Sequence, residues 1–221
     1  MPYNKGDLYE QTIFEILQNK KLIPENFLRA GAGGGADVKF VYKSQSYNLE
    51  VKADLNADYG QKMLRWNLDS KLWYWSVDNP VTQLYTSIGV LDYVNEKKFI
   101  PNRFTVPTDR ITIQHKKQDQ KAFEDRHDLD IRALYEFYSH KNCYYIQVGG
   151  YGFYHLQEDI LNLNTTKFNC GIHLRLRAKT IHSVPIHNYG FYAVIKTNGE
   201  PELSAYDIEE KDNRSFPPIV I

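Results

Sequence analysis

The sequence has few of the features that mark secreted or membrane-bound proteins. Only two cysteines, Cys143 and Cys170, occur in 221 residues, far apart along the chain. Neither a disulfide framework nor a short cysteine metal motif is therefore indicated. No apolar run approaches the roughly 18 residues that a membrane span needs, and the first residues lack the apolar segment of a signal peptide. We expect a cytoplasmic chain with reduced thiols and no membrane association.

An excess of charge of one sign is also absent. The 27 Lys and Arg residues are balanced by 27 Asp and Glu residues, so the composition does not indicate a generally basic nucleic-acid binder. A neutral chain can still gather carboxylates at one site and cations along a cleft. The seven histidines show no zinc-ligand spacing, which argues against a zinc centre.

Aromatic residues are plentiful, at 17 Tyr, 11 Phe and 3 Trp, and they favour a β-rich core. The length suits one substantial domain. A helix followed by a strand meander and then by mixed elements predicts an α/β (α+β) fold built from packed layers. We therefore expect a single domain over residues 1–221.

Hydrophobic periodicity predicts the individual elements. Tyr9, Ile13, Ile16 and Leu17 share one face of an amphipathic helix over residues 6–20. Further along the chain we expect a helix at 59–75, mixed structure at 84–100, a solvated helix or mobile loop in the charged span 114–130, a helix at 131–140, strands at 143–148, 171–177 and 189–195, and an irregular final segment.

Two predicted strands, about 36–42 and 47–53, flank a short polar turn and form an antiparallel hairpin. Side chains of a strand alternate between its faces, so Glu50 and Lys52 share one face. Asp37 stands near the start of the partner strand. The hairpin is therefore expected to bring the carboxylates of Asp37 and Glu50 together beside the ammonium group of Lys52.

Two close carboxylates repel each other unless a positive charge lies between them. Mg²⁺ meets this need because it prefers oxygen ligands and completes its shell with water and substrate phosphate. The bound ion polarises a phosphoryl oxygen and lowers the pKa of a coordinated water. Lys52 is suited to orient that water or to offset developing negative charge. These residue types predict hydrolysis of a phosphodiester.

The first helix adds an independent indication. At 100° per residue its apolar arc spans about 80° to 240°, with Glu10 at about 200° and Glu15 at about 340°. A carboxylate that faces a core needs a partner. A metal ion, or a residue beside one, is a suitable partner for Glu10.

Together these elements resemble the PD-(D/E)XK nuclease superfamily over residues 6–66. The matching segments are Tyr9-Glu10, Arg29 to Gly35, Gly35-Ala36-Asp37-Val38 and Leu49-Glu50-Val51-Lys52. Ala36 stands where the superfamily motif has proline. The resemblance implies a restriction-endonuclease-like core, with a central mixed β-sheet flanked by helices. It also implies the following roles: Asp37, Glu50 and the carbonyl of Val51 as metal ligands, Lys52 as the catalytic lysine, Glu10 as an accessory carboxylate, and Gln61 as an auxiliary residue.

Basic residues outside the hairpin are candidates for DNA contact. Arg175, Arg177 and Lys179 alternate along a predicted strand, where arginine suits bidentate contacts with phosphate or base edges. A solvated strand face is the alternative reading of this pattern. The other candidates are Arg29 before the glycine run, and Gln61, Lys62 and Arg65 on the helix expected at 59–75.

The sequence therefore predicts a DNA endonuclease that uses Mg²⁺, or Mn²⁺ in its place. The length favours a type II restriction enzyme that cuts double-stranded DNA as a homodimer, because cutting two strands needs two sites. Its catalytic core would occupy about residues 6–75, and the C-terminal part would carry recognition and dimer contacts. The alternatives are a structure-specific nuclease, such as a Holliday-junction resolvase or repair enzyme, and a non-catalytic DNA-binding module.

Overall fold

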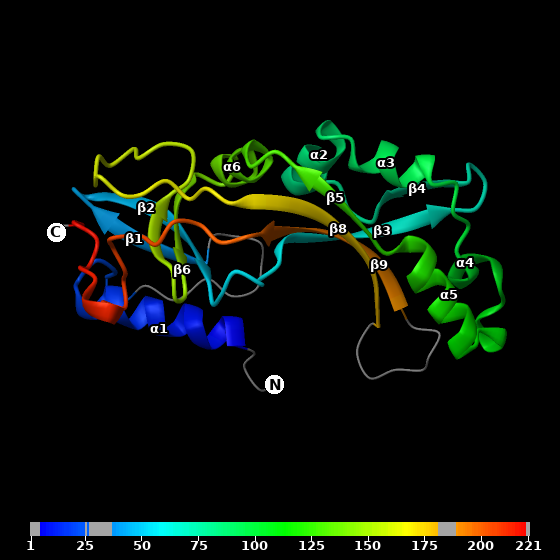
Figure 1. The fold of residues 1–221 in the computed structure, drawn as a ribbon, viewed down its shortest axis with the longest axis horizontal. Helices are drawn as coiled ribbons and strands as arrows, with labels where there is room; N and C mark the ends of the chain where they lie inside the picture. Colours follow the sequence, from blue (N-terminus) through cyan, green and yellow to red (C-terminus); the bar gives the residue numbers. More distant parts are fainter. Residues whose placement is uncertain (1–4, 25, 27–36, 181–188, 220–221) are drawn as a thin grey trace. The chain divides into compact units, whose positions relative to one another are not determined.

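The computed structural model describes residues 5–24, 26, 37–180 and 189–219. They form two compact units of mixed helices and sheets, consistent with the predicted α+β class (Figure 1). Unit 1 comprises Met1–Ala57, Leu134–Gly171 and Thr197–Ile221, and unit 2 comprises Asp58–Ala133 and Ile172–Lys196. The single nuclease domain stays a prediction. None of the described helices is both long and apolar enough to cross a membrane.

Unit 1 is built on a mixed four-stranded sheet in the order β1-β2-β6-β7. Its strands are β1 (Val38–Tyr42), β2 (Gln45–Lys52), β6 (Cys143–Val148) and β7 (Gly152–His155). β1 and β2 form the predicted antiparallel hairpin, β6 runs parallel to β2, and β7 is antiparallel to β6. Lys43 and Ser44 both have positive φ, so the turn is a two-residue connection whose twist matches that of the strands.

The two faces of this sheet carry different side chains. Helix α1 (Lys5–Asn19) packs on the face formed by Leu49 and Val51, and buries Ile13 and Leu17 there. Strand alternation directs Glu50 and Lys52 to the opposite face. On that side lies α6 (Arg132–Ser139), whose residues from Leu134 onward belong to unit 1 (Figure 1). The polar pair is therefore enclosed between the sheet and a second helix.

Unit 2 contains a five-stranded sheet in the order β4-β3-β9-β8-β5. The strands are β3 (Tyr59–Asn67), β4 (Leu72–Trp75), β5 (Asp125–Leu129), β8 (Gly171–Thr180) and β9 (Tyr189–Asn198). The helices are α2 (Pro80–Ser87), α3 (Val90–Glu96), α4 (Asn102–Thr105) and α5 (Ile113–Phe123), with the 3₁₀ turn η1 (Thr108–Arg110) before α5. A second 3₁₀ turn, η2 (Lys211–Asn213), belongs to unit 1.

Aromatic rings hold the helices of unit 2 to one face of its sheet. Trp73 and Phe191 lie 4.9 Å apart between ring centroids, and Phe123 of α5 lies 5.0 Å from Trp73 and 4.8 Å from Phe191. Trp73, Phe123 and Phe191 are all buried. The high aromatic content of the sequence is used here as the apolar layer between sheet and helices.

The helix predicted for 59–75 is wrong, because these residues form the antiparallel pair β3 and β4. Gln, Lys, Met and Leu favour a helix locally, but packing overrides that weak preference. Leu64 and Trp66 are buried while Arg65 between them is exposed, which is the alternation of a strand. Trp66 pairs with Trp73 across the two strands, and this contact was not visible in the sequence pattern.

Elsewhere the predicted elements agree with the structure to different extents. The helices at 6–20 and 131–140 and the strand at 143–148 are confirmed. The strands expected at 171–177 and 189–195 extend to Thr180 and Asn198. The charged span 114–130 divides into the end of α5 and the strand β5. Strand β7 was not predicted, because its Gly152-Phe153-Tyr154-His155 run lacks a polar alternation.

Candidate active site at the β1–β2 hairpin

The hairpin brings Asp37, Glu50 and Lys52 together. Val38 pairs with Leu49, so Asp37, one residue earlier, stands opposite Glu50. The Asp37 carboxylate accepts a 2.9 Å hydrogen bond from the main-chain N–H of Val51. Lys52 Nζ lies 2.5 Å from Glu50 Oε1 and 3.8 Å from Asp37 Oδ2. A single ammonium group thus lies between two carboxylates, as the sequence predicts.

Tyr138 of α6 holds the central carboxylate from the other side. Its hydroxyl donates a 2.8 Å hydrogen bond to Glu50 Oε1, the same oxygen that Lys52 approaches. Tyr138 is fully buried and Glu50 is only 4% exposed. Our sequence reasoning missed Tyr138. The spacing of four residues from Leu134, which is also buried, was the available signal for an inward-facing position on that helix.

The electrostatics of Asp37 show that the two carboxylates are in conflict. Burial, reinforced by the charge of Glu50, raises the pKa of Asp37 to about 7. Lys52 and the Val51 N–H act in the opposite direction, and their effect is smaller. A buried carboxylic acid beside a second carboxylate keeps its proton until a further positive charge is supplied. At neutral pH the site therefore favours the entry of a cation.

Glu10 lies within electrostatic reach of this pair. It is half-buried on α1, whereas Glu15 on the same helix is exposed, in agreement with the helical phase read from the sequence. The charge of Glu10 contributes to the raised pKa of Asp37. A catalytic role for Glu10 stays a prediction.

The donor set fits a divalent ion held by few protein ligands. Among the described residues, no three His, Cys, Asp or Glu side chains are grouped so that they could hold a metal ion. Asp37 and Glu50 supply two carboxylates, and their mutual repulsion is the feature that a cation relieves. Mg²⁺ is commonly bound by one or two carboxylates with water and substrate phosphate. The carbonyl of Val51 as a third ligand stays a prediction.

The predicted DNA-contact residues, Arg29 apart, lie on the sheet of unit 2. Gln61, Lys62 and Arg65 belong to strand β3 rather than to a helix, which corrects the placement expected from sequence. Arg175, Arg177 and Lys179 belong to β8, as predicted. Arg29 lies outside the residues that the structure describes. The structure thus separates these candidates, as members of unit 2, from the carboxylates of unit 1.

Arg177 already has protein partners. Its guanidinium donates to Asp58 Oδ2 at 2.7 Å and also to the side-chain oxygen of Gln61. Asp58 in turn accepts from Lys196 at 3.0 Å. Arg175 is half-buried, and Lys179 is exposed. The three cations predicted on this strand therefore differ in how available they are for a ligand.

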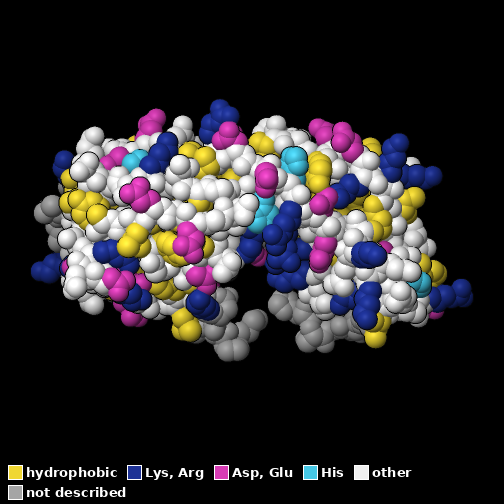
Figure 2. Space-filling model, viewed as in Figure 1, with side chains coloured by type: hydrophobic (Ala, Val, Ile, Leu, Met, Phe, Trp, Pro, Cys, Tyr) yellow, Lys and Arg dark blue, Asp and Glu magenta, His cyan; other side chains and the backbone are white. Residues whose placement is uncertain are grey.

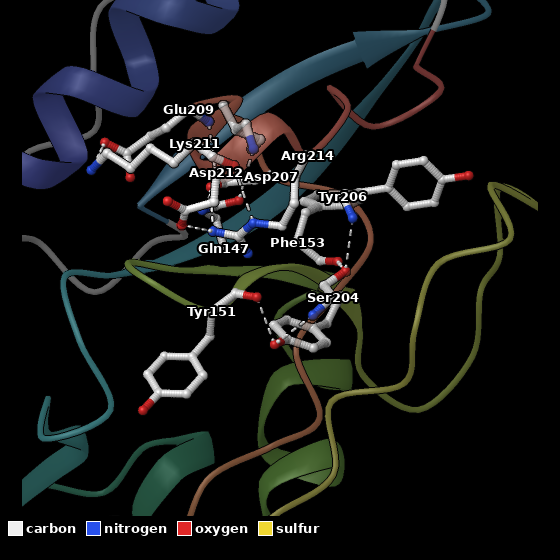
Figure 3. Close-up of polar contacts among 12 residues, drawn as sticks. Gln147, Tyr151, Phe153, Ser204, Tyr206, Asp207, Glu209, Lys211, Asp212 and Arg214 are labelled. Carbon is white, nitrogen blue, oxygen red and sulfur yellow. Dashed lines mark hydrogen bonds and ion pairs between the residues drawn. The ribbon is translucent and has the colours of Figure 1, made fainter.

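A second polar network of unit 1 fixes the helix that carries Glu10. Tyr9 donates a 2.9 Å hydrogen bond to Glu209 and accepts one of 3.1 Å from Gln147. Gln147 also donates to Asp207 at 2.8 Å, and Arg214 forms an ion pair with Asp207 at 2.8 Å. Figure 3 shows Gln147 and Arg214 directed toward Asp207. The network ties α1 to β6 and to the C-terminal segment.

This network is buried, so its partners depend on each other. Gln147 and Asp207 are both 0% exposed, and Gln147 Oε1 accepts from the N–H of Ile208. A buried charge requires a paired partner, which Arg214 supplies. Gly152 of β7 faces the same place, because a Cβ there would lie 2.3 Å from the carbonyl oxygen of Tyr206 and 2.8 Å from Arg214 Nη1. The sequence gave no indication of these contacts.

Comparisons of the chain with protein-family models, with curated proteins and with solved structures found no match. The functional argument therefore rests on the chemistry of the hairpin residues.

Proposed function

We propose that this chain is a Mg²⁺-dependent DNA endonuclease with a restriction-endonuclease-like core. The observation that carries the proposal is the hairpin site, where Lys52 lies between two buried carboxylates and the pKa of Asp37 is about 7. The mixed sheet of unit 1, with α1 on one face and α6 on the other, supports the core that the resemblance implies. Mn²⁺ is expected to replace Mg²⁺.

Each residue of the site has a defined task in phosphodiester hydrolysis. The ion, when held by Asp37 and Glu50, supplies Lewis acidity and a coordinated water of lowered pKa. The Val51 N–H fixes Asp37, and the Tyr138 hydroxyl fixes Glu50. Lys52 places a positive charge where negative charge develops on the phosphate, or donates to the attacking water. Fixing the groups beforehand reduces the reorganisation needed in the transition state.

Duplex DNA is the substrate that we propose, and a type II restriction enzyme is the class. Phosphate contacts alone carry no sequence information, and unit 2 adds a sheet of about a hundred residues beyond the hairpin unit. Sequence-specific cutting of both strands needs two active sites, so we propose a homodimer acting in the cytoplasm.

A digest of long linear DNA tests this proposal. The purified chain is incubated with Mg²⁺, with Mn²⁺ or with EDTA, and the DNA ends are sequenced. Discrete fragments with one shared end sequence, formed only with a divalent ion, are expected. Cutting in EDTA would contradict the metal mechanism. Cutting confined to branched DNA would support a structure-specific nuclease instead of a restriction enzyme.

A further inference from the structure

The five-stranded sheet of unit 2 has a second face that the helices do not use. On β8 the residues Leu174 and Leu176 are buried on the helix-covered face. Strand alternation places His173, Arg175 and Arg177 on the opposite face. This opposite face carries polar and charged residues on the central strand of a sheet, where apolar residues would pack equally well if the face were only structural.

Two arginines stand directly across from each other on that face. Arg126 of β5 pairs with Arg175 of β8, and Asp128 pairs with His173. Like charges directly opposite on neighbouring strands are destabilising. Within the described residues, neither guanidinium has a carboxylate within ion-pair distance. The protein thus keeps two adjacent positive charges without an internal anion to compensate them.

His173 lies beside this pair and is the least satisfied polar side chain of the face. It is 6% exposed, and both of its ring nitrogens are buried without a hydrogen-bond partner in the described structure. Burial, together with the charges of Arg126, Lys196 and Arg175, lowers the pKa of His173, and the carboxylate of Asp128 opposes that effect. A neutral imidazole retains one N–H to donate. An oxyanion would accept from it and neutralise the neighbouring arginines.

The positive charges extend along the strand instead of surrounding one point. Alternate residues of a strand are about 6.6 Å apart, so Arg175, Arg177 and Lys179 form a row. Arg65 of β3 pairs across the sheet with Tyr74 of β4, which is 44% exposed. Figure 2 shows Lys and Arg side chains grouped where β3, β8 and β9 run in Figure 1. A row of cations beside an exposed ring matches a chain of phosphates with bases.

We propose that Arg126, Arg175 and His173 bind a phosphate of the DNA backbone, and that this sheet face is the surface by which unit 2 holds DNA. The choice of DNA as the polymer rests on the proposed nuclease function. The oxygens of one phosphodiester accept from both guanidiniums and from the imidazole N–H. Arg177, held by Asp58 and Gln61, braces the strand between Arg175 and Lys179.

Binding measured without cleavage tests the proposal. Fluorescence anisotropy of a short labelled DNA duplex is recorded in EDTA over a range of salt concentrations. Arg126→Ala and Arg175→Ala are each expected to weaken binding and to reduce the slope of log K against log salt by about 1, the loss of one phosphate contact. Lys117→Ala removes an exposed cation of α5 and is expected to change neither quantity. Asp128→Asn is expected to tighten binding.

The possible outcomes separate this inference from the proposed nuclease. Unchanged binding and slope in both arginine variants, with unchanged thermal melting, would overturn it. Variants that lose inorganic phosphate binding in calorimetry but keep DNA binding would overturn the choice of a polymer. If the wild type binds DNA through Arg126 and Arg175 but never cuts it, this inference stands and the nuclease proposal fails.

Discussion

The two units treat buried charge in opposite ways. In unit 1, Glu50 is enclosed with two partners, Lys52 and Tyr138, so its charge is satisfied within the protein. In unit 2, Arg126 and Arg175 face each other without an ion-pair partner among the described residues. The first arrangement fixes groups before a reaction, and the second leaves charge available for a ligand. The comparison indicates a division between a reacting unit and a holding unit.

The largest effect that would break this comparison is expected from Lys52→Ala. Without the ammonium group, the transition state loses its countercharge, and cleavage is expected to fall on the order of 10²-fold or more. The two carboxylates also lose the cation between them, so Mg²⁺ should raise the melting temperature of the variant more than that of the wild type. Thermal melts with and without Mg²⁺ measure this second effect. Equal shifts in the two proteins would contradict a metal site at this pair.

Tyr138→Phe sharpens the assignment of the enclosed carboxylate. Removing the hydroxyl leaves buried Glu50 with one fewer donor, at a cost of about 1–3 kcal/mol in the free energy of unfolding. Cleavage is expected to fall about tenfold because Glu50 is less firmly oriented. Rates and denaturant melts are measured together.

Tyr135→Phe is the matched control for that variant. Tyr135 lies on the same helix, is buried, and donates to the carbonyl oxygen of Phe168. A similar loss of stability with unchanged cleavage is expected. Equal losses of cleavage in the two variants would show that Tyr138 acts only through folding.

The raised pKa of Asp37 predicts a pH dependence of stability in unit 1. Its pKa is about 7 in the folded chain against a model value of 3.8, so the folded state keeps a proton that the unfolded state releases. Stability therefore falls as pH rises from about 4 to 7, by at most about 4 kcal/mol. Denaturant melts in EDTA measure the slope. Asp37→Asn, or added Mg²⁺, should flatten it, and an equally steep slope in Asp37→Asn would contradict the assignment.

The smallest expected effect lies in unit 2. Arg126→Ala removes one member of the like-charged cross-strand pair and is expected to raise the free energy of unfolding by about 0.2–1 kcal/mol in low salt. High salt should reduce the gain because it screens the repulsion. A loss of stability instead would show that the two arginines are compensated by the fold.

The hairpin and the phase of the first helix were accessible from the sequence because both depend on local periodicity. Asp37, Glu50 and Lys52 lie within 16 residues of one chain segment, and strand alternation alone puts Glu50 and Lys52 on one face. Tyr138 lies 88 residues from Glu50, and Asp207 lies 60 residues from Gln147. Such contacts depend on topology, which local patterns do not specify. The β3–β4 pair was missed for a related reason, since its Trp66–Trp73 contact outweighs local helix propensity.

The division of tasks also explains why the strand cations were hard to interpret from sequence. The pattern Arg175, Arg177 and Lys179 predicts one exposed row, and the structure shows that its members differ. Arg177 is occupied by Asp58, whereas Arg175 stands opposite Arg126. The partner strand β5 comes from the charged span 114–130, whose role the sequence left open.

The most direct test of the central claim is a comparison of wild type with Glu50→Gln on supercoiled plasmid DNA. Glutamine keeps the size of the side chain and can still accept from Tyr138, but it removes the charge that would hold a cation. The account predicts cleavage by the wild type with Mg²⁺, none detectable by Glu50→Gln, and equal binding of DNA in EDTA. Cleavage by Glu50→Gln at near the wild-type rate would contradict the assignment of the hairpin as the active site.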